Sequence, residues 1–489
     1  MGEKTVAIIG AGIGGLAAGC YAQTSGLKAH IFEAHRQPGG LCTSWMRKGF
    51  TFDGSIHHLA GCRPGNAVYR MWEELGAMPR DCVFPDRLTQ VVSTDGRTFD
   101  VFTDTDRLEE HMLAEFSQDR IQIRKYTKAV RAFRKHDLLE APVRTRAGLL
   151  RYIAATPLLL RWAKPTMADV GTWFRDPFLR QAFPRVQYDW TGIPAMMHLN
   201  ILAQCSRQNY GFPIGGSLPV ARAIEQRFRS LGGEISYGAR VAKILTAGDR
   251  AVGVRLADGT EVRADGVISN AFAPATLFDL LDPHVLDDRT RSRFAVREDA
   301  MMMGLHVSFG VDRDLRDEPQ ALLLLQDEPV RLADQTLRSV PVELYGFDAS
   351  LAPAGKGVIK VLLDTSYAHW ERLAQDRSQY EEAKERLAEG VIRILEPRLP
   401  GITAQIETVD VATPLTTERF TGNGRNYKPA SGSDDMLSMI LSKPRSLPAI
   451  RNLWLVGQSA GGGGIPGCAA MGRKAVRALV KELRATSKD

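Results

Sequence analysis

Two groups of residues near the start of the chain are suited to chemistry: glycines spaced to hold a pyrophosphate, and a histidine pair able to exchange protons. Gly10, Gly12 and Gly15 form a Gly-x-Gly-x-x-Gly pattern, with Gly14 inside it. The first glycine of such a pattern permits a tight turn, the second lets backbone approach the pyrophosphate, and the third lets a helix pack close to a strand. Glu33 follows at the spacing of an acid that binds an adenosine ribose.

The histidine pair, His57 and His58, comes just after an Asp53-Gly54 turn. An imidazole titrates near neutral pH and serves as acid or base when a proton must leave or reach a bound molecule. We therefore name His57 and His58 as candidate catalytic residues and expect Asp53 to fix the turn. In the alternative, one ring packs under a cofactor and the other bonds to backbone.

The elements that must position the first glycines form a βαβ unit. Residues 6–9 are predicted to form a strand, residues 16–22 a helix and residues 28–33 a second strand. In this order the helix N-terminus faces the phosphates with unpaired N–H groups and the positive end of its dipole. The sequence therefore predicts a dinucleotide site, and a glycine-rich turn in an ordinary βαβ unit is the alternative.

The end of the chain repeats this arrangement. A predicted strand ends at Gly457, and a glycine run then leads through Gly464-Ile465-Pro466 into a helix. Proline in a first helical turn and a glycine-rich approach leave N–H groups that can face an anion. We expect this second helix N-terminus to hold the far end of the same cofactor.

The pattern between these stretches predicts an α/β fold with more than one core. A single strand is expected over residues 235–245, and a second sheet over residues 301–365. The expected division has five segments: a dinucleotide-binding domain in 1–105, 206–275 and 448–489, a helical subdomain in 106–205, and a mixed-sheet substrate domain in 276–447.

The positive charge of the chain is concentrated in one segment. Residues 120–164 contain twelve Lys or Arg and two acidic residues, a local net charge of +10, whereas the whole chain has +7. One interpretation is a pair of core helices with solvated charges; the other is a surface that rests on anionic lipid. Nucleic acid is ranked low because the segment is interleaved with leucines and has no nucleic-acid-binding motif.

The six cysteines are scattered and form no Cys-x-x-Cys pattern. This usage is typical of reduced thiols in a cytosolic protein and predicts neither a disulfide framework nor a metal site. No apolar run reaches the roughly eighteen residues that a transmembrane helix needs. The expected location is therefore cytoplasmic, with contact to a membrane surface through the basic segment.

Taken together, these stretches resemble the phytoene desaturase family, within it the branch of carotenoid cis-trans isomerases and retinol saturases. The likeness rests on the first glycines with Glu33, on residues 49–61 and 215–270, and on the LWLVGQSAGGGGIPGCAAMGRKAV stretch. It implies FAD in a two-dinucleotide-binding-type domain, an apolar tunnel, and helices that dock on a membrane.

The resemblance also implies particular contacts to FAD. The glycine pair Gly39-Gly40, followed by Leu41, returns the chain to the pyrophosphate. The turn that contains Ser55 passes beside the isoalloxazine ring, and the backbone of Val241 contacts the adenine end. The Gly464 helix faces the flavin N1/C2 edge.

The expected function is FAD-dependent oxidation or reduction of C–C and C=C bonds in an apolar isoprenoid or polyene lipid, with hydride transfer at flavin N5. The alternatives are redox-neutral cis-trans isomerisation of a polyene, amine oxidation, and non-catalytic lipid binding of the Rab GDP-dissociation inhibitor type. The chain has no second dinucleotide fingerprint. We therefore expect oxygen, a quinone or a redox protein as electron partner, and the oligomeric state stays open.

Overall fold

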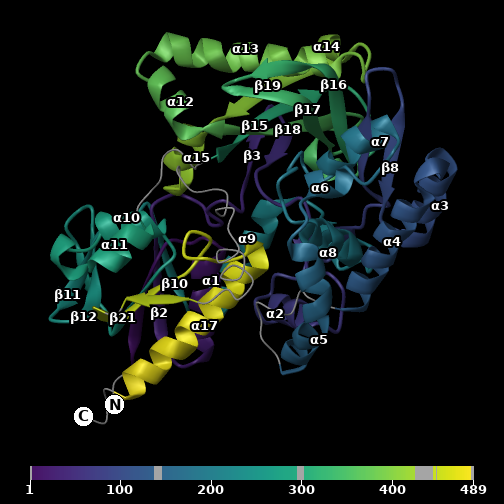
Figure 1. The fold of residues 1–489 in the computed structure, drawn as a ribbon. Helices are drawn as coiled ribbons and strands as arrows, with labels where there is room; N and C mark the ends of the chain where they lie inside the picture. The colour runs from purple at the N-terminus through teal and green to yellow at the C-terminus, as the bar shows by residue number, and fades with distance from the viewer. Residues whose placement is uncertain (1–2, 137–145, 295–301, 424–443, 448, 486–489) are drawn as a thin grey trace.

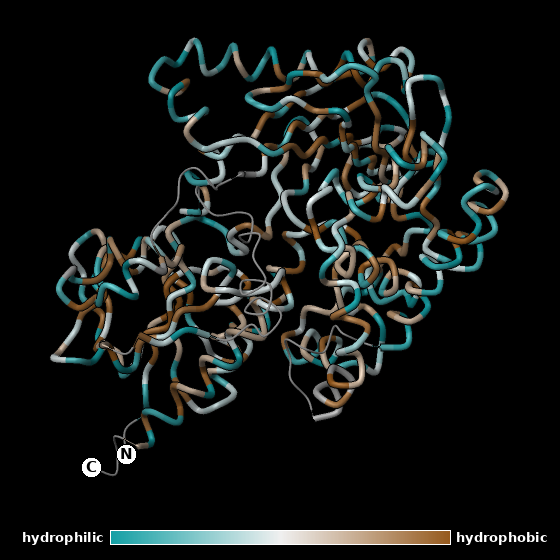
Figure 2. The backbone as a smooth tube through the Cα atoms, in the orientation of Figure 1, coloured by the Kyte–Doolittle hydropathy of each residue, from teal (hydrophilic) through white to brown (hydrophobic). Residues whose placement is uncertain are grey.

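The described residues form two large β-sheets, two small ones of two and three strands, and a helical region (Figure 1). The computed structural model describes residues 3–136, 146–294, 302–423, 444–447 and 449–485. Hydrophobic residues follow the strands of both sheets in Figure 2. Separate buried clusters lie under the first sheet, within the helical region and under the second sheet.

The first sheet is nine-stranded and holds the predicted βαβ unit. Its main path runs β10-β2-β1-β14-β21-β12-β11, and β13 and β20 pair with β12 and β21. The strands from β10 to β21 on this path are parallel, as in dinucleotide-binding folds. The bounds are β1 Thr5–Ile9, β2 Lys28–Glu33, β10 Glu234–Tyr237, β11 Val241–Ala247, β12 Arg250–Leu256, β13 Glu261–Arg263, β14 Gly266–Ser269, β20 Arg445–Leu447 and β21 Ile450–Leu455.

Three helices cover this sheet: α1 Ile13–Thr24, α9 Ser217–Ser230 and α17 Gly464–Ala485. The predicted single strand over residues 235–245 is wrong, because the chain turns at Gly238 with a φ of 68°. The two halves, β10 and β11, lie at opposite edges of the sheet.

The second sheet has seven strands in the order β19-β15-β18-β17-β16-β7-β8. The hairpin β7–β8 joins it through parallel pairing of β7 with β16. Residues 87–102, which precede the expected boundary at residue 105, therefore lie in the second sheet. The bounds are β7 Arg87–Val92, β8 Thr98–Phe102, β15 Met302–Val311, β16 Ala321–Leu332, β17 Gln335–Leu344, β18 Gly357–Ser366 and β19 Ile406–Ala412.

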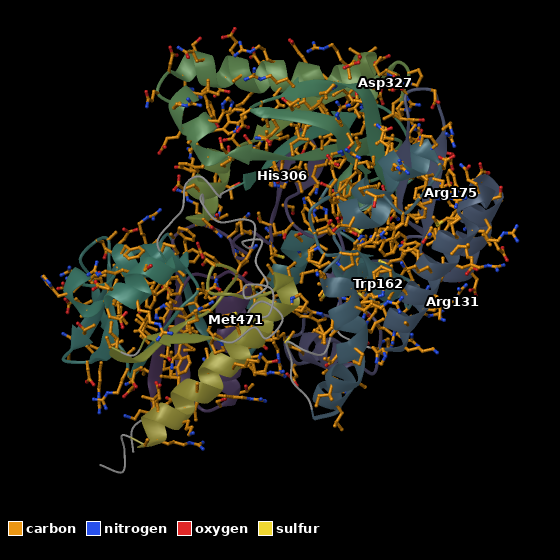
Figure 3. All side chains as sticks on the ribbon, viewed as in Figure 1. Arg131, Trp162, Arg175, His306, Asp327 and Met471 are labelled. Atoms are coloured by element: carbon orange, nitrogen blue, oxygen red, sulfur yellow. The ribbon has the colours of Figure 1, made fainter. Side chains whose placement is uncertain are left out.

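The two faces of this sheet differ in chemistry. On β15, Leu305, Val307 and Phe309 pack with apolar residues of helix α13 Arg377–Leu395. The alternate residues, His306 and Ser308, point to the other face because side chains alternate along a strand. Figure 3 shows His306 on the edge of the second sheet that faces the nucleotide-binding part. The polar face is therefore the one toward the first sheet.

The helical region connects the two sheets. Its main helices are α3 Thr105–Glu115, α4 Arg120–Lys135, α5 Arg146–Ala163 and α8 Ala195–Cys205. They share an aromatic-rich core with β7, β8 and β16. Within the described residues, no helix is long and apolar enough to cross a membrane.

Candidate functional site

The first glycines form a tight junction between β1 and α1. Gly10 has a φ of 90°, and its N–H donates to the carbonyl of Phe32 at 2.8 Å. A β-carbon added at Gly15 would overlap the Gly10 carbonyl oxygen. The third glycine is therefore required for the helix to leave the strand this closely, as the spacing predicts.

Asn270, which follows β14, is a site residue that the sequence reasoning missed. Its amide lies where a β-carbon at Gly12 or Gly457 would be, with 2.5 Å from Nδ2 to the first and 2.7 Å from Oδ1 to the second. The backbone N–H of Asn270 donates to the carbonyl of Ile9 at 2.8 Å. The signal available in the sequence was its place at the end of a strand predicted to enter the same sheet.

The glycine pair returns to the fingerprint. The Gly39 N–H donates to the Ala11 carbonyl at 2.9 Å, and Gly12 and Gly39 form a parallel bridge. A β-carbon on Gly40 would lie 3.5 Å from the Cα of Gly12. Leu41 follows this turn and is half-buried. The fingerprint loop and the Gly39-Gly40 turn thus lie side by side. Together they form a surface of glycines, called the glycine surface below, that consists of Gly10, Gly12, Gly14, Gly15, Gly39 and Gly40.

Glu33 lies at the end of β2 against this surface. Its Oε2 accepts the Ala11 N–H at 2.6 Å, and its Oε1 accepts the His35 N–H at 2.8 Å. The Glu33 carbonyl accepts the Ala239 N–H at 2.9 Å, so the chain leading to Val241 runs past the same strand end. The proposed ribose acid and the proposed adenine contact are therefore neighbours.

The second helix N-terminus adjoins the first. Gly464, Ile465 and Pro466 form the first turn of α17. Further along, a β-carbon on Gly472 would lie 2.5 Å from the Gly14 carbonyl oxygen, so α17 crosses α1 at close range. Helix N-termini attract anions, and two of them flank this glycine surface.

Asp53 fixes the next turn, as predicted. Its Oδ1 accepts the N–H groups of Ser55 and Ile56, each at 3.1 Å, and the Ser217 hydroxyl at 2.8 Å. Its Oδ2 accepts the Ser217 N–H at 2.5 Å. The carboxylate is buried and fully occupied by the turn and by the start of α9.

The turn carries His57 to a buried ionic cluster, defined here as Glu343, Lys360, Tyr345 and His57. The Glu343 carboxylate bonds to His57 Nδ1, accepts the Tyr345 hydroxyl at 2.7 Å and lies 2.8 Å from Lys360 Nζ. Lys360 Nζ also donates to the Asp53 carbonyl at 3.2 Å. The cluster therefore ties the polar face of the second sheet to the turn beside the nucleotide-binding part.

The cluster sets the charge of its members. Burial alone would raise the pKa of Glu343, but positive charge at His57 and Lys360 outweighs it and holds that pKa well below its ordinary value. Burial and the Glu343 charge raise the pKa of Tyr345 well above its ordinary value. Glu343 is thus ionised and Tyr345 neutral at neutral pH.

His58 has a different environment from its neighbour. Its ring stacks on Tyr210 with centroids 6.4 Å apart, and its buried Nδ1 has no hydrogen-bond partner among the described residues. Burial, assisted by the charge of His57, lowers the pKa of His58 to about 4. His58 is therefore neutral at neutral pH and is a weak base.

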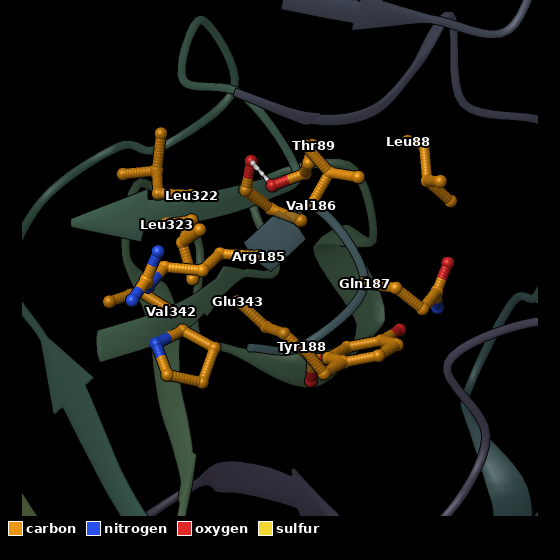
Figure 4. A pocket seen from close by; sticks show the side chains of 12 residues that line it. Leu88, Thr89, Arg185, Val186, Gln187, Tyr188, Leu322, Leu323, Val342 and Glu343 are labelled. Carbon is orange, nitrogen blue, oxygen red and sulfur yellow. Dashed lines mark hydrogen bonds between the residues drawn. The ribbon is translucent and has the colours of Figure 1, made fainter. Parts of the chain in front are cut away.

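Two adjoining cavities open beside the cluster and share Leu88, Tyr188, Ala321 and Glu343 in their walls. Figure 4 shows Tyr188 and Glu343 side by side in the wall of the first. The second has aromatic side chains around the histidines and is lined by His57, His58, Arg87, Leu88, Tyr188, Phe212, Gln320, Ala321, Glu343, Tyr345 and Phe347. The structure thus brings both predicted histidines to one cavity, and Ser55 lies in the turn that leads to them.

Comparison with known proteins decides the class. Residues 13–480 match the family described as Flavin containing amine oxidoreductase. The chain belongs to this family. It is similar to the lycopene-forming phytoene desaturase of Paracoccus sp. (strain N81106 / MBIC 01143), with 27% identity and coverage of 98% of each chain. It is also similar to prolycopene isomerase 1, chloroplastic, of Oncidium hybrid cultivar, with 27% identity over 94% of this chain and 80% of the isomerase.

Among solved structures, wild-type putrescine oxidase bound to putrescine shares the fold, with a TM-score of 0.60, 14% identity, and coverage of 98% of this chain and 99% of that one. The flavin family membership confirms three predictions: the phytoene desaturase resemblance, the fold class and FAD as cofactor. The protein is an FAD-dependent oxidoreductase.

The described backbone fits FAD. Gly39 bonds to Ala11 in the fingerprint loop, and the Asn270 side chain lies against both Gly12 in that loop and Gly457. Backbone N–H groups at two helix N-termini can neutralise a pyrophosphate and a flavin edge that becomes anionic on reduction. Glu33 completes this surface at the strand end where a ribose binds in such folds.

Proposed function

We propose that this flavoprotein desaturates or saturates C–C bonds of an apolar isoprenoid or polyene lipid. The relatives support the substrate class, because a phytoene desaturase and a prolycopene isomerase align over nearly the whole chain. The observation that carries the proposal is the aromatic cavity into which Glu343 and the turn at Asp53 hold a single oriented imidazole, His57. An aromatic wall suits an apolar substrate, and the imidazole suits the proton that accompanies hydride transfer.

In this proposal, the glycine surface and its neighbours hold FAD. Gly10, Gly12, Gly14, Gly15, Gly39, Gly40 and Leu41 surround the pyrophosphate, Glu33 and Val241 the adenosine, and Ser55, Gly457, Gly464, Ile465 and Pro466 the flavin. When bound, FAD supplies the hydride acceptor or donor at N5. Asn270 positions the loops at Gly12 and Gly457 relative to each other.

Proton exchange is assigned to His57. The ionised Glu343 engages Nδ1, which fixes the ring orientation and leaves Nε2 to exchange a proton with the substrate. Lys360 holds Glu343 in place from the opposite side. His58 stays neutral and shapes the cavity wall. Of the two candidate histidines, the surroundings thus favour His57 as the acid or base.

Redox-neutral cis-trans isomerisation is the second candidate. The similarity to a prolycopene isomerase favours it. Both isomerisation and hydride transfer need a flavin next to a bound polyene. The residues proposed here to hold FAD and to line the cavity would therefore suit either reaction. Amine oxidation has less support, because the curated relatives that align over nearly the whole chain are a phytoene desaturase and a prolycopene isomerase.

A membrane surface is the proposed source of the substrate. Helix α5 exposes three apolar side chains, Leu150 at 68%, Ile153 at 61% and Leu160 at 71%. Arg161 and Lys164, both exposed, follow at its end. Exposed apolar residues next to cations are typical of helices that lie on anionic lipid. Part of the basic segment, residues 137–145 with Arg144, lies outside the described residues.

The test is product analysis on the holoenzyme. Phytoene or lycopene in liposomes is incubated with the protein, with oxygen or a quinone as acceptor, or with chemically reduced flavin. The expected product differs in the number or the geometry of double bonds, and His57→Gln lowers the desaturation or saturation rate about 10²-fold or more. Unchanged polyenes in all arms, with turnover of putrescine instead, would overturn the proposal.

A further inference from the structure

Cys62 and Cys82 form a pair of thiols outside the site described above. Their Sγ atoms lie 3.5 Å apart, and either can donate the hydrogen bond. Within the described part of the chain this is the one thiol–thiol hydrogen bond. Cys62 is buried and Cys82 is half-buried, so a small oxidant can reach the pair through Cys82.

The two cysteines belong to segments on opposite edges of one strand, β9 Tyr210–Pro213. Strand β5 Leu59–Ala60, which ends two residues before Cys62, pairs with one edge of β9. Strand β6 Cys82–Val83 pairs with the other edge. The Cys82 side chain lies over Gly211 of β9, which has no β-carbon to block it, and the two sulfurs thus meet across the strand that separates them.

The environment divides the roles of the two thiols. The hydrogen bond from Cys62 lowers the pKa of Cys82, against the effect of burial. The same hydrogen bond, together with burial, raises the pKa of Cys62. A thiolate is the nucleophile in thiol oxidation. Cys82 is also the more exposed of the two thiols, while Cys62 is buried and its Sγ lies 3.2 Å from the Leu59 carbonyl oxygen. Exposure and pKa together assign the first reaction to Cys82 and the resolving step to Cys62.

We propose that Cys62 and Cys82 are a reversible dithiol–disulfide pair that hydrogen peroxide oxidises. The Cys82 thiolate attacks the peroxide O–O bond to give a sulfenic acid and hydroxide, which takes up the thiol proton to become water. The Cys62 sulfur then attacks the Cys82 sulfur, forming the S–S bond and releasing a second water. Two thiols and one peroxide thus become one disulfide and two waters.

The disulfide would act on the wall of the cavity. It links the segment just after His58 to β6, and Val83 of β6 pairs with Phe212 of β9. His58 and Phe212 both line the second cavity. Oxidation therefore cross-links the segments on the two sides of β9, the strand that carries Phe212 in the cavity wall.

The test counts and maps thiols in the holoenzyme before and after hydrogen peroxide. We expect free thiols in the denatured protein to fall from six to four, with a Cys62–Cys82 cross-linked peptide in the mass spectrum that dithiothreitol removes. Cys205→Ser, which changes a buried thiol of the helical core, should form the same cross-link. Cys62→Ser should leave a sulfenic acid at Cys82 that dimedone traps, and Cys82→Ser should leave Cys62 unmodified.

The thiol count and the peptide map of the wild-type protein are enough to show whether the disulfide forms. The test therefore does not depend on whether every variant folds. Six remaining thiols, or a cross-link between other cysteines, would overturn it. A sulfenic acid trapped at Cys62 in Cys82→Ser, with none trapped at Cys82 in Cys62→Ser, would overturn the assigned order of attack.

Discussion

Lys360 Nζ lies 2.8 Å from Glu343 Oε2, and the lysine side chain is only 1% exposed. The two residues come from neighbouring antiparallel strands, since Glu343 on β17 pairs in register with Lys360 on β18. Such a pair in a sheet interior is costly unless further hydrogen bonds satisfy it, and here His57, Tyr345 and the Asp53 carbonyl do so. The ion pair thus anchors the imidazole proposed for proton exchange.

Removal of Lys360 should destabilise the protein strongly. In Lys360→Met, the Glu343 carboxylate loses one of its two ion-pair partners, which costs about 3–5 kcal/mol in the free energy of unfolding. Urea unfolding followed by circular dichroism measures this. The matched control is Arg386→Met, which removes an ion pair with Glu382 on the exposed face of α13 and should have little effect. Equal losses in both variants would contradict the role of burial.

Acid should weaken the fold through His198. Burial lowers the pKa of this histidine from 6.5 to about 3, and its Nε2 bonds to the Tyr126 hydroxyl at 2.7 Å. Between these two values the unfolded chain binds a proton that the folded chain does not. Stability therefore falls as pH is lowered below 6.5, with a slope of up to about 1.4 kcal/mol per pH unit.

The variant His198→Gln should show a shallower loss over the same pH range, measured as the free energy of unfolding at several pH values. His284→Gln, at an exposed position, is the control and should keep the wild-type slope. A wild-type slope in His198→Gln would show that this ring is protonated in the folded protein.

A single methyl group at Gly12 should reduce flavin binding. In Gly12→Ala the added carbon lies 2.5 Å from Asn270 Nδ2 and occupies the surface proposed for the pyrophosphate. We expect FAD affinity to fall at least about tenfold, or 1.4 kcal/mol, measured as flavin fluorescence released on dilution. Gly192→Ala makes the same change in open space and should bind FAD normally. If Gly12→Ala binds as much flavin as the wild type, the pyrophosphate does not contact Gly12.

Membrane binding should depend on helix α5. Replacement of Leu150, Ile153 and Leu160 by Ser should reduce co-sedimentation with anionic liposomes, because each buried aliphatic side chain contributes about 1.5–3 kcal/mol. Salt should weaken wild-type binding, since exposed charges are screened over about 10 Å at 0.1 M ionic strength. The control Met46→Ser changes a comparably exposed residue outside the basic segment. Identical sedimentation of all three proteins, or no binding at all, would show that α5 is a solvated helix that does not bind membranes.

Local patterns predicted the nucleotide-binding part, but not the ionic cluster. The spacing of Gly10, Gly12 and Gly15 predicts the tight turn between β1 and α1, because all three glycines lie within six residues of one another. The structure places Gly39 beside Gly12, as expected. His57 and Glu343 are 286 positions apart, so no periodicity in the sequence indicates that they meet. Strand pairing decides such contacts.

The course of two segments could not be predicted for the same reason. The break at Gly238 sends two short strands to opposite sheet edges, and β7 joins the second sheet through a partner more than two hundred residues away. Asn270 was missed because an asparagine after a strand has many uses, and only packing reveals that it fills the space beside Gly12 and Gly457.

The most direct test of the proposed function follows the absorbance of bound flavin under anaerobic conditions in a stopped-flow instrument. Oxidised holoenzyme is mixed with phytoene in liposomes, reduced holoenzyme with lycopene in liposomes, and oxidised holoenzyme with putrescine. We expect one of the polyenes to change the flavin absorbance, more slowly by about 10²-fold in His57→Gln, and no change with putrescine. Reduction of the flavin by putrescine, with neither polyene altering it, would contradict the assignment of an apolar polyene substrate.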